Sequence, residues 1–182
     1  IDSLGNVVLP TEYNEIWKGD KLFISRKDGY NELRDVQLNI KFRSMEYRLQ
    51  PSQFLRESVS IFKDSENSNQ YTVGLMNSEG KIIIPCKYDM LIDGFNKFGL
   101  AKVRRNHRYG FVDTTGKEII ECKYQSVGEF KEGLLQVRLN DKWGFVDTKG
   151  KTIIKHQFEG VHAFSNELAL VTKREGFDLY YH

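Results

Sequence analysis

The chain has 182 residues, of which 40% are hydrophobic and 29% are charged, a composition typical of a globular domain rather than of a disordered segment. The formal net charge of +2 is too small to indicate nucleic acid or an anionic membrane as a partner, and apolar runs such as Ile82–Ile84 are too short to span a bilayer. Aromatic residues make up 13% of the chain and there are only three Pro, which favours strands over helices.

The first predicted unit covers residues 1–30. A turn sequence from Asp2 to Gly5 precedes a short apolar strand at Val7–Val8, and a later strand is expected at Leu22–Ile24. The first residue is Ile1 rather than Met, which indicates either a removed leader or a fragment. The compartment therefore stays open between the cell envelope or exterior and the cytoplasm.

The second predicted unit, residues 31–70, is a degenerate copy. Its last strand is expected at Ser58–Phe62, whereas the middle of the segment has lost the recurring signature. The alternating segment Val36–Phe42 predicts an amphipathic strand whose apolar members face the core, namely Val36, Leu38, Ile40 and Phe42. A drifted repeat is favoured over a segment specific to this protein.

Three clearer units follow, covering residues 71–108, 109–142 and 143–182. Gly74, Gly110 and Gly144 open the shared motif and are separated by 36 and 34 residues. The motif continues into an Asp-x-x-Gly turn and then a short apolar strand. Its recurring structural positions are Gly74, Gly110 and Gly144, the aromatic residues Tyr109 and Trp143, the turn residues Asp113 and Asp147, and the turn glycines Gly80, Gly116 and Gly150.

The turn chemistry predicts β-hairpins. An Asp side chain caps the turn, and Gly at the fourth position adopts the left-handed conformation that closes it. A second hairpin is expected around Asn140–Asp141, so each unit becomes a meander of about three strands. The Gly after the aromatic residue is interpreted as room for an aromatic ring of the adjacent unit.

The segment Lys142–Lys151 resembles the WG repeat of bacterial proteins, and Arg108–Asp113 is similar, with Tyr in place of Trp. The resemblance covers residues 71–177 and 1–30, and hardly covers 31–70. It implies an all-β fold and a role in protein interactions. It brings no catalytic residues with it.

The predicted fold is therefore all-β, with tandem antiparallel hairpin repeats of about 36 residues in a single domain. The last residues, Glu175–Tyr180, resemble a motif strand without its turn, and the first residues supply a turn and strand without the preceding one. Pairing of this last strand beside Val7–Val8 would close a propeller-like ring. Such a ring is favoured over an open β-array or solenoid.

Candidate chemistry is sparse. Cys86, Cys122 and His156 occupy one repeat position, but they are a full period apart, so neither a zinc site nor a disulfide is expected. Repeated Asp residues are interpreted as turn residues rather than acid/base groups. No catalytic motif is present, and we expect no cofactor, no metal and no enzymatic activity.

One cationic cluster offers a speculative binding surface on the hairpin after Leu100. It comprises Lys102, Arg104, Arg105, His107 and Arg108. Such a tip could contact an acidic partner, a polyanion or a lipid headgroup, although a solvated hairpin tip is the simpler interpretation.

The favoured function is a non-enzymatic scaffold that binds a protein or polymer. One alternative is a carbohydrate-binding or sugar-processing module, which would need exposed aromatic rings. Another is a regulatory domain of a larger protein. A protein partner is favoured, a polysaccharide is the alternative, and neither nucleic acid nor a membrane span is expected.

Overall fold

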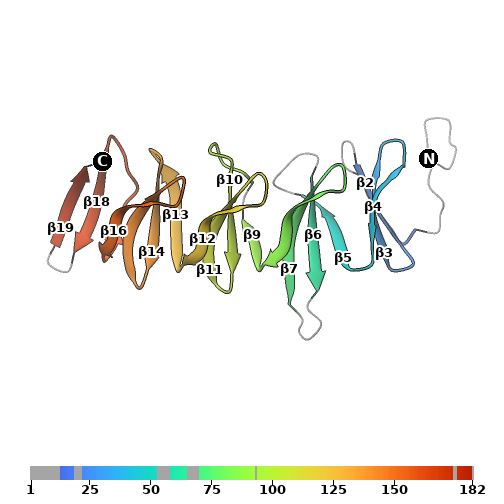
Figure 1. Cartoon of the computed structure of the whole chain (residues 1–182), viewed down its shortest axis with the longest axis horizontal. Helices are drawn as coiled ribbons and strands as arrows, with labels where there is room; N and C mark the ends of the chain where they lie inside the picture. Colours follow the sequence, from blue (N-terminus) through green and yellow to red (C-terminus); the bar gives the residue numbers. More distant parts are fainter. Residues whose placement is uncertain are drawn as a thin grey trace. The chain divides into compact units, whose positions relative to one another are not determined.

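The computed structural model describes residues 13–18, 22–52, 58–64, 70–92, 94–173 and 176–181, and every regular element within them is a β-strand (Figure 1). The strands form five separate antiparallel sheets, named A to E here, and within each sheet the strands pair in chain order. The prediction of an all-β chain of tandem antiparallel repeats is confirmed.

Each sheet is a meander with its own consecutive strands. Sheet A consists of β1 (Glu15–Lys18), β2 (Leu22–Lys27), β3 (Tyr30–Asp35) and β4 (Ile40–Ser44). Sheet B consists of β5 (Tyr47–Pro51), β6 (Ser58–Asp64), β7 (Tyr71–Asn77) and β8 (Ile82–Tyr88). Sheet C consists of β9 (Met90–Ile92), β10 (Leu100–Arg105), β11 (Arg108–Asp113) and β12 (Glu118–Tyr124). Sheet D consists of β13 (Ser126–Lys131), β14 (Leu134–Leu139), β15 (Lys142–Asp147) and β16 (Thr152–Phe158), and sheet E of β17 (Gly160–Val161), β18 (Leu168–Lys173) and β19 (Gly176–Tyr181).

Sheets A to D have four strands each, so the expectation of about three strands per unit is wrong. In sheet C the additional strand is β9, which follows Tyr88 and pairs with β10. In sheet D it is β13, which follows Tyr124 and pairs with β14. These strands escape sequence analysis because they are short or contain a register shift, as between Val127 and Phe130.

In sheets A, C and D, a two-residue turn joins the second strand to the third. Both turn residues have positive φ at Asp28–Gly29, Asn106–His107 and Asn140–Asp141. This is the type I′ geometry, which matches the right-handed twist of paired strands and which Asn, Asp and Gly tolerate best. The hairpin expected at Asn140–Asp141 therefore joins β14 to β15.

The Asp-x-x-Gly turn joins the third strand to the fourth. Asp113 Oδ1 accepts the backbone N–H groups of Thr115 at 2.8 Å and Lys117 at 3.0 Å, and Gly116 has a φ of 82°. Asp147 repeats this pattern with Lys149 and Lys151, both at 2.9 Å. The carboxylate thus satisfies two backbone donors within the turn, and Gly provides the left-handed residue.

The glycine of the motif leaves room for backbone and not for a neighbouring aromatic ring, which corrects the expectation. A Cβ on Gly74, Gly110 or Gly144 would lie 2.3, 2.4 or 2.6 Å from a carbonyl oxygen of the following strand in the same sheet. In sheets C and D that outer strand bulges, with register shifts on both sides of Phe111 and Phe145. The bulge carries the carbonyl over the glycine, which only Gly permits.

The degenerate segment forms the same turn as the other repeats, although its sequence lacks the turn glycine. Asp35 Oδ1 accepts the N–H groups of Gln37 at 3.0 Å and Asn39 at 2.9 Å, and Leu38 takes the place of the turn glycine with a φ of 67°. Val36 lies in this turn and is 51% exposed, while Ile40, the first residue of β4, pairs with Arg34 and is 46% exposed. The expectation that both face the core is wrong, whereas Phe42 packs against the core cluster of sheets A and B and Leu38 is half-buried in the turn.

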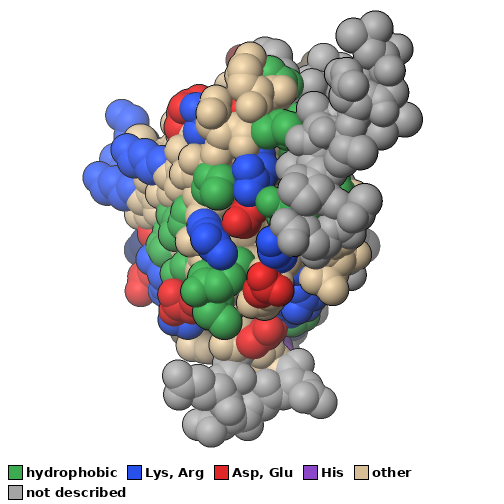
Figure 2. All heavy atoms as spheres, turned by 90° about the vertical axis from the view of Figure 1, so that its right-hand side faces the viewer, with side chains coloured by type: hydrophobic (Ala, Val, Ile, Leu, Met, Phe, Trp, Pro, Cys, Tyr) green, Lys and Arg blue, Asp and Glu red, His purple; other side chains and the backbone are tan. Residues whose placement is uncertain are grey.

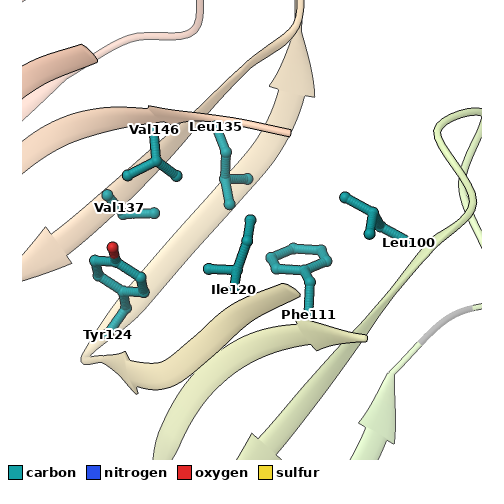
Figure 3. Packing of buried hydrophobic residues seen from close by; sticks show 7 residues of the cluster. All are labelled: Leu100, Phe111, Ile120, Tyr124, Leu135, Val137 and Val146. Atoms are coloured by element: carbon teal, nitrogen blue, oxygen red, sulfur yellow. The ribbon is translucent and has the colours of Figure 1, made fainter. Parts of the chain in front are cut away.

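The apolar core lies between successive sheets, within each of two compact units, residues 1–87 and 88–182. In the second unit, Leu100, Phe111, Ile120 and Tyr124 of sheet C meet Leu135, Val137 and Val146 of sheet D (Figure 3). A second cluster joins sheets D and E around Phe145, Phe158 and Phe164. In the first unit, Ile24 and Leu33 of sheet A pack against Val59, Ile61 and Met76 of sheet B.

The single-domain assignment and its unit boundaries stay predictions. The Val7–Val8 strand that would complete a ring lies outside the described residues, as does Asp2, so ring closure also stays a prediction. Among the described residues, no helix has the length and apolarity needed to cross a membrane.

Candidate functional site

Sheet C differs from sheets D and E in one segment. From the buried Tyr88 to Leu100 the chain advances 12 residues, whereas it advances 10 from Tyr124 to Leu134 and 10 from Phe158 to Leu168. The two additional residues account for the longer spacing of 36 residues between Gly74 and Gly110. They enlarge the connection between the first two strands of sheet C.

Asn96 shapes this longer connection. Its Oδ1 accepts the N–H groups of Phe98 at 2.9 Å and Leu100 at 3.1 Å, and Gly99 closes the turn with a φ of 70°. Sheet D has instead a tight turn with positive φ at Glu132 and Gly133. The larger turn presents the Phe98 side chain, which is 37% exposed.

A cavity of about 400 Å³ lies beside this turn, between sheets C and D. Three phenylalanine rings line it: Phe98 and Phe130 have ring centroids 5.4 Å apart, and Phe130 meets Phe111 edge-on at the same distance. Between sheets D and E the corresponding edge-on pair is Phe145 and Phe164, at 4.9 Å. The edge-on pair of Phe111 and Phe130 thus recurs as Phe145 and Phe164, and Phe98 is a third ring added to the first pair.

The cavity has charged residues of both signs. Lys102 is half-buried in its wall, while Lys97 and Lys131 are exposed, and Lys97 Nζ lies 5.1 Å from the Phe98 ring centroid. The acidic members are Glu129 and Glu132, and Glu132 accepts the backbone N–H of Glu167 at 3.0 Å. An apolar floor with a polar rim is the usual composition of a recognition pocket.

The structure places the five cations predicted from sequence in different surroundings. Lys102 lines the cavity, Arg104 Nε lies 4.0 Å from Asp89, and Arg105 binds Glu118 with two hydrogen bonds of 3.1 and 3.2 Å. His107 and Arg108 are exposed at the hairpin tip, where the His107 N–H donates to Asp89 at 3.3 Å. Two of the five cations therefore lie against acidic groups of the same sheet.

Arg105 belongs to a half-buried network that orders the start of β12. Tyr88 Oη donates to Glu118 Oε2 at 3.3 Å, and Glu118 Oε1 accepts the Cys122 N–H at 2.9 Å. Burial, followed by the nearby charge of Glu118, raises the pKa of Tyr88 well above its ordinary value. The phenol is thus a hydrogen-bond donor in this network.

Cys86, Cys122 and His156 lie at equivalent positions of β8, β12 and β16. Both cysteines are free thiols, and Cys86 Sγ donates to the Ile61 carbonyl at 3.4 Å. Burial raises the pKa of the Cys86 thiol to about 11, so it is protonated at neutral pH. The His156 ring stacks on Tyr124 with centroids 5.9 Å apart.

The family model of the WG-containing repeat matches residues 74–106, 109–143 and 143–176, which together are more than half of the chain. The chain belongs to the WG-containing repeat family. The three matches fall on sheets B to E, and none covers sheet A. Among curated proteins, the comparison finds no match.

Several solved structures resemble the fold at low identity. Kluyveromyces lactis Hsv2 aligns over 94% of this chain and 60% of its own, with 12% identity and a TM-score of 0.38. The AfRom2 CNH domain aligns over 93% and 67%, with 12% identity and a TM-score of 0.36. A Bacteroides caccae protein of unknown function aligns over 90% and 72%, with 10% identity and a TM-score of 0.28. The WG-repeat chain spans about three fifths of the Hsv2 chain length.

Sequence reasoning overlooked Phe98 and Phe130 as site residues. The signal that would have found them is the pair of additional residues before Leu100, because an insertion in one WG repeat marks where that copy differs from its neighbours. The repeat aromatics Tyr109 and Trp143 are both half-buried, and Trp143 packs against the core between sheets D and E.

Proposed function

We propose that this WG-repeat chain is a non-enzymatic binding module for a partner protein, and that the cavity between sheets C and D receives one apolar side chain of that partner. The cavity carries the proposal, because it is the feature in which sheet C departs from its neighbours. Family membership supports a scaffold role without naming a partner.

The dimensions and walls of the cavity suit a single anchoring side chain. Its volume of about 400 Å³ is at the lower end of ligand pockets, which span roughly 300 to 1,000 Å³. Aromatic residues dominate the energetic centres of protein interfaces, where an anchor from one partner fills a pocket of the other. Phe98, Phe111 and Phe130 provide such a pocket, and Phe98 is accessible from solvent.

The rim favours a peptide of mixed charge over a polyanion. Three lysines and two glutamates line the cavity, so no single sign of charge dominates. Such a rim adds specificity and affects the association rate more than the affinity. Non-enzymatic binding is also supported by the turn roles of Asp113 and Asp147, whose carboxylates are occupied by backbone donors.

The repeat aromatics give the carbohydrate alternative little support. Stacking on sugars needs exposed aromatic rings, whereas Tyr109 and Trp143 are half-buried at their repeat positions. A regulatory role within a larger protein remains compatible with the same cavity, because both uses require a partner segment to bind there.

The experiment is a selection of displayed peptides on the 182-residue chain, followed by affinity measurements with Phe98→Ser. We expect the selected peptides to share one aromatic or aliphatic anchor, and Phe98→Ser to weaken them at least tenfold, about 1.4 kcal/mol. The matched control is Tyr71→Ser, which removes another exposed aromatic ring, 48% exposed, in sheet B. Peptides that bind both variants equally well, or a selection without binders, would refute the proposed site.

The fold prediction also includes closure of the repeat units into a propeller-like ring. Among the described residues, sheet E has three strands where sheets A to D have four, and β19 is its edge, so a strand supplied from residues 7–8 would restore the common pattern. Small-angle scattering tests closure, because a compact chain of this length has a radius of gyration of about 16 Å. A substantially larger value in a monodisperse sample would favour an open array.

A further inference from the structure

The middle strands of sheet A carry polar residues where the other sheets are apolar. The first set of equivalent cross-strand pairs is Ile61 with Gly74, Val103 with Gly110, and Val137 with Gly144, and sheet A has Ser25 with Glu32. The second set is Val59 with Met76, Ala101 with Val112, and Leu135 with Val146, and sheet A has Phe23 with Arg34. Three of the four residues that sheet A places at these positions are polar.

These positions lie on the side of a sheet that meets the preceding one. Val137 and Val146 of sheet D pack against sheet C, and Val59, Ile61 and Met76 of sheet B pack against sheet A. Ile24 and Leu33 face sheet B, so Ser25, Glu32 and Arg34, on the alternate positions, lie on the opposite face. Figure 2 looks onto that face and shows basic and acidic side chains interspersed with hydrophobic ones.

Glu32 is the centre of this polar cluster. Its side chain is only 5% exposed, and its Oε2 accepts the Ser25 hydroxyl at 3.2 Å and the Arg34 guanidinium at 3.1 and 2.7 Å. Arg43 Nε lies 3.4 Å from Oε1. A carboxylate removed from water in this way is tolerated only with such partners, so the residues form one unit.

Arg34 holds the cluster to the surrounding chain. Its guanidinium also donates to the Leu38 carbonyl at 2.7 Å and to Tyr13 Oη at 3.0 Å, and it lies 5.7 Å from the Tyr13 ring centroid. Lys27 Nζ approaches the same ring at 5.9 Å. Among the described residues, the contacts of Arg34 on this face are therefore polar or phenolic, in contrast to the aliphatic contacts between the other sheets, although Phe23 and Ile16 share the face.

The backbone of sheet A also differs from that of sheets C and D in the register of its outer strand. The β3–β4 pairing is regular across Glu32, and its first register shift comes only after Leu33. In sheets C and D the outer strand already shifts before Phe111 and Phe145, where the glycine lies. Without that bulge no carbonyl lies over the position, so a side chain fits there.

We propose that Ser25, Glu32, Arg34 and Arg43 form a polar cap that ends the apolar stacking of WG repeats at this face of sheet A. An apolar face here would bind the exposed face of a repeat from a second copy, which is a head-to-tail contact that extends without closing. Terminal units of repeat proteins carry a polar outer face for this reason. The cap keeps a second copy of this chain from adding to the stack.

The test converts the cap to the residues of sheets C and D, using the 182-residue chain with Ser25→Val, Glu32→Gly and Arg34→Val. The net charge is unchanged, because one acidic and one basic residue are removed together. We expect the weight-average sedimentation coefficient of this variant to rise with concentration, while the unaltered chain shows a much weaker dependence.

The matched control is Arg48→Val with Asp64→Val, which removes an exposed ion pair of 2.7 Å in sheet B, also without a change in net charge. It should sediment like the unaltered chain. Equal self-association of control and cap variant would overturn the proposal, because exposed apolar groups anywhere would then suffice.

A second variant covers the case in which the triple change does not fold, as judged by circular dichroism. Glu32→Gln with Arg34→Met removes both charges at similar side-chain volume, and it should self-associate more than the unaltered chain. A folded cap variant that sediments like the unaltered chain at all concentrations overturns the proposal. If that variant is also more stable, the result would instead favour a ring in which this face packs against sheet E.

Discussion

Sheets A and D have the same four-stranded meander but treat one backbone position in opposite ways. In sheet D, Gly144 lies under the bulged strand β16, with no space for a side chain. In sheet A the corresponding Glu32 lies opposite a regular stretch of β4 and fills its space with a buried ion pair. The glycine and the bulge therefore occur together in sheet D, and sheet A has neither of them at the corresponding position.

The turn after the third strand shows what the repeat retains. Asp35 and Asp147 hold the same pair of backbone donors, although Leu38 replaces the glycine in sheet A. The hydrogen bonds of the turn are thus the same in both sheets, even though sheet A lacks the glycine by which the turn is recognised in the sequence. Four changes in sequence test how far the two kinds of sheet differ.

The largest effect is expected from Glu32→Ala in sheet A. This change leaves Arg34, which is 13% exposed, without its carboxylate, and breaking such a buried pair costs about 3–5 kcal/mol. Because the chain has two compact units, one Trp in each, unfolding in urea should be followed by Trp17 fluorescence in a Trp143→Phe background. A loss below about 1 kcal/mol would mean that the pair is replaceable by solvent.

A smaller loss is expected from Gly110→Ala in sheet C. The new Cβ would lie 2.4 Å from the Ile120 carbonyl oxygen, so β12 must shift, at a cost of about 1–3 kcal/mol. The control is Gly160→Ala, whose Cβ would meet Thr172 Oγ1 at an ordinary 3.4 Å. Equal losses in urea unfolding followed by Trp143 would show that the strand gives way without strain.

The difference between the sheets also explains which parts of the fold the sequence predicts. Asp113 with Gly116, and Asn140 with Asp141, are residues whose local chemistry selects a turn, so both hairpins of a repeat are predictable. The turn at Asp35 is missed because a Leu stands at the left-handed position. That costs only about 1–2 kcal/mol, which the Arg34 bond to the Leu38 carbonyl helps to offset.

The candidate site was less predictable than the fold. The longer spacing before Gly110 is visible in the sequence, but an insertion does not reveal that Phe98 will lie beside Phe130 across two sheets. The cationic cluster was visible too, but the acidic partners of Arg104 and Arg105 come from Asp89 and Glu118, which are 15 and 13 residues away in the chain. Pairing across strands brings these groups together, and local patterns do not encode it.

Leu38→Gly should make the turn of sheet A more like the others and stabilise the first unit. Relief of the left-handed Leu, whose φ is 67°, is worth about 1 kcal/mol, from which the loss of half-buried side-chain contacts is subtracted. The reciprocal change, Gly116→Leu, should destabilise the second unit by about 1–2 kcal/mol. Urea unfolding followed by Trp17 and Trp143 measures each; a destabilised Leu38→Gly variant would show that the side-chain contacts outweigh the strain.

The smallest effect is expected from His156, whose burial between sheets contrasts with the charged cluster of sheet A. Its ring stacks on Tyr124, and among the described residues no partner lies within hydrogen-bonding distance of its buried Nε2. Burial, and then the charge of Lys123, lower the pKa of His156 below its ordinary value of 6.5. Protonation is therefore easier in the unfolded chain than in the folded one.

The sign of the pH dependence follows from that difference. Above pH 6.5 the imidazole is neutral in both states and its contribution to stability is complete; as the pH falls below 6.5, the unfolded chain binds more protons and the free energy of unfolding decreases. His156→Gln should flatten this slope in urea unfolding between about pH 7.5 and pH 5, and the same substitution at the exposed His162 is the matched control. An unchanged slope in His156→Gln would mean that the contact between sheets C and D accommodates an imidazolium, and that polar tolerance is not confined to the face of sheet A.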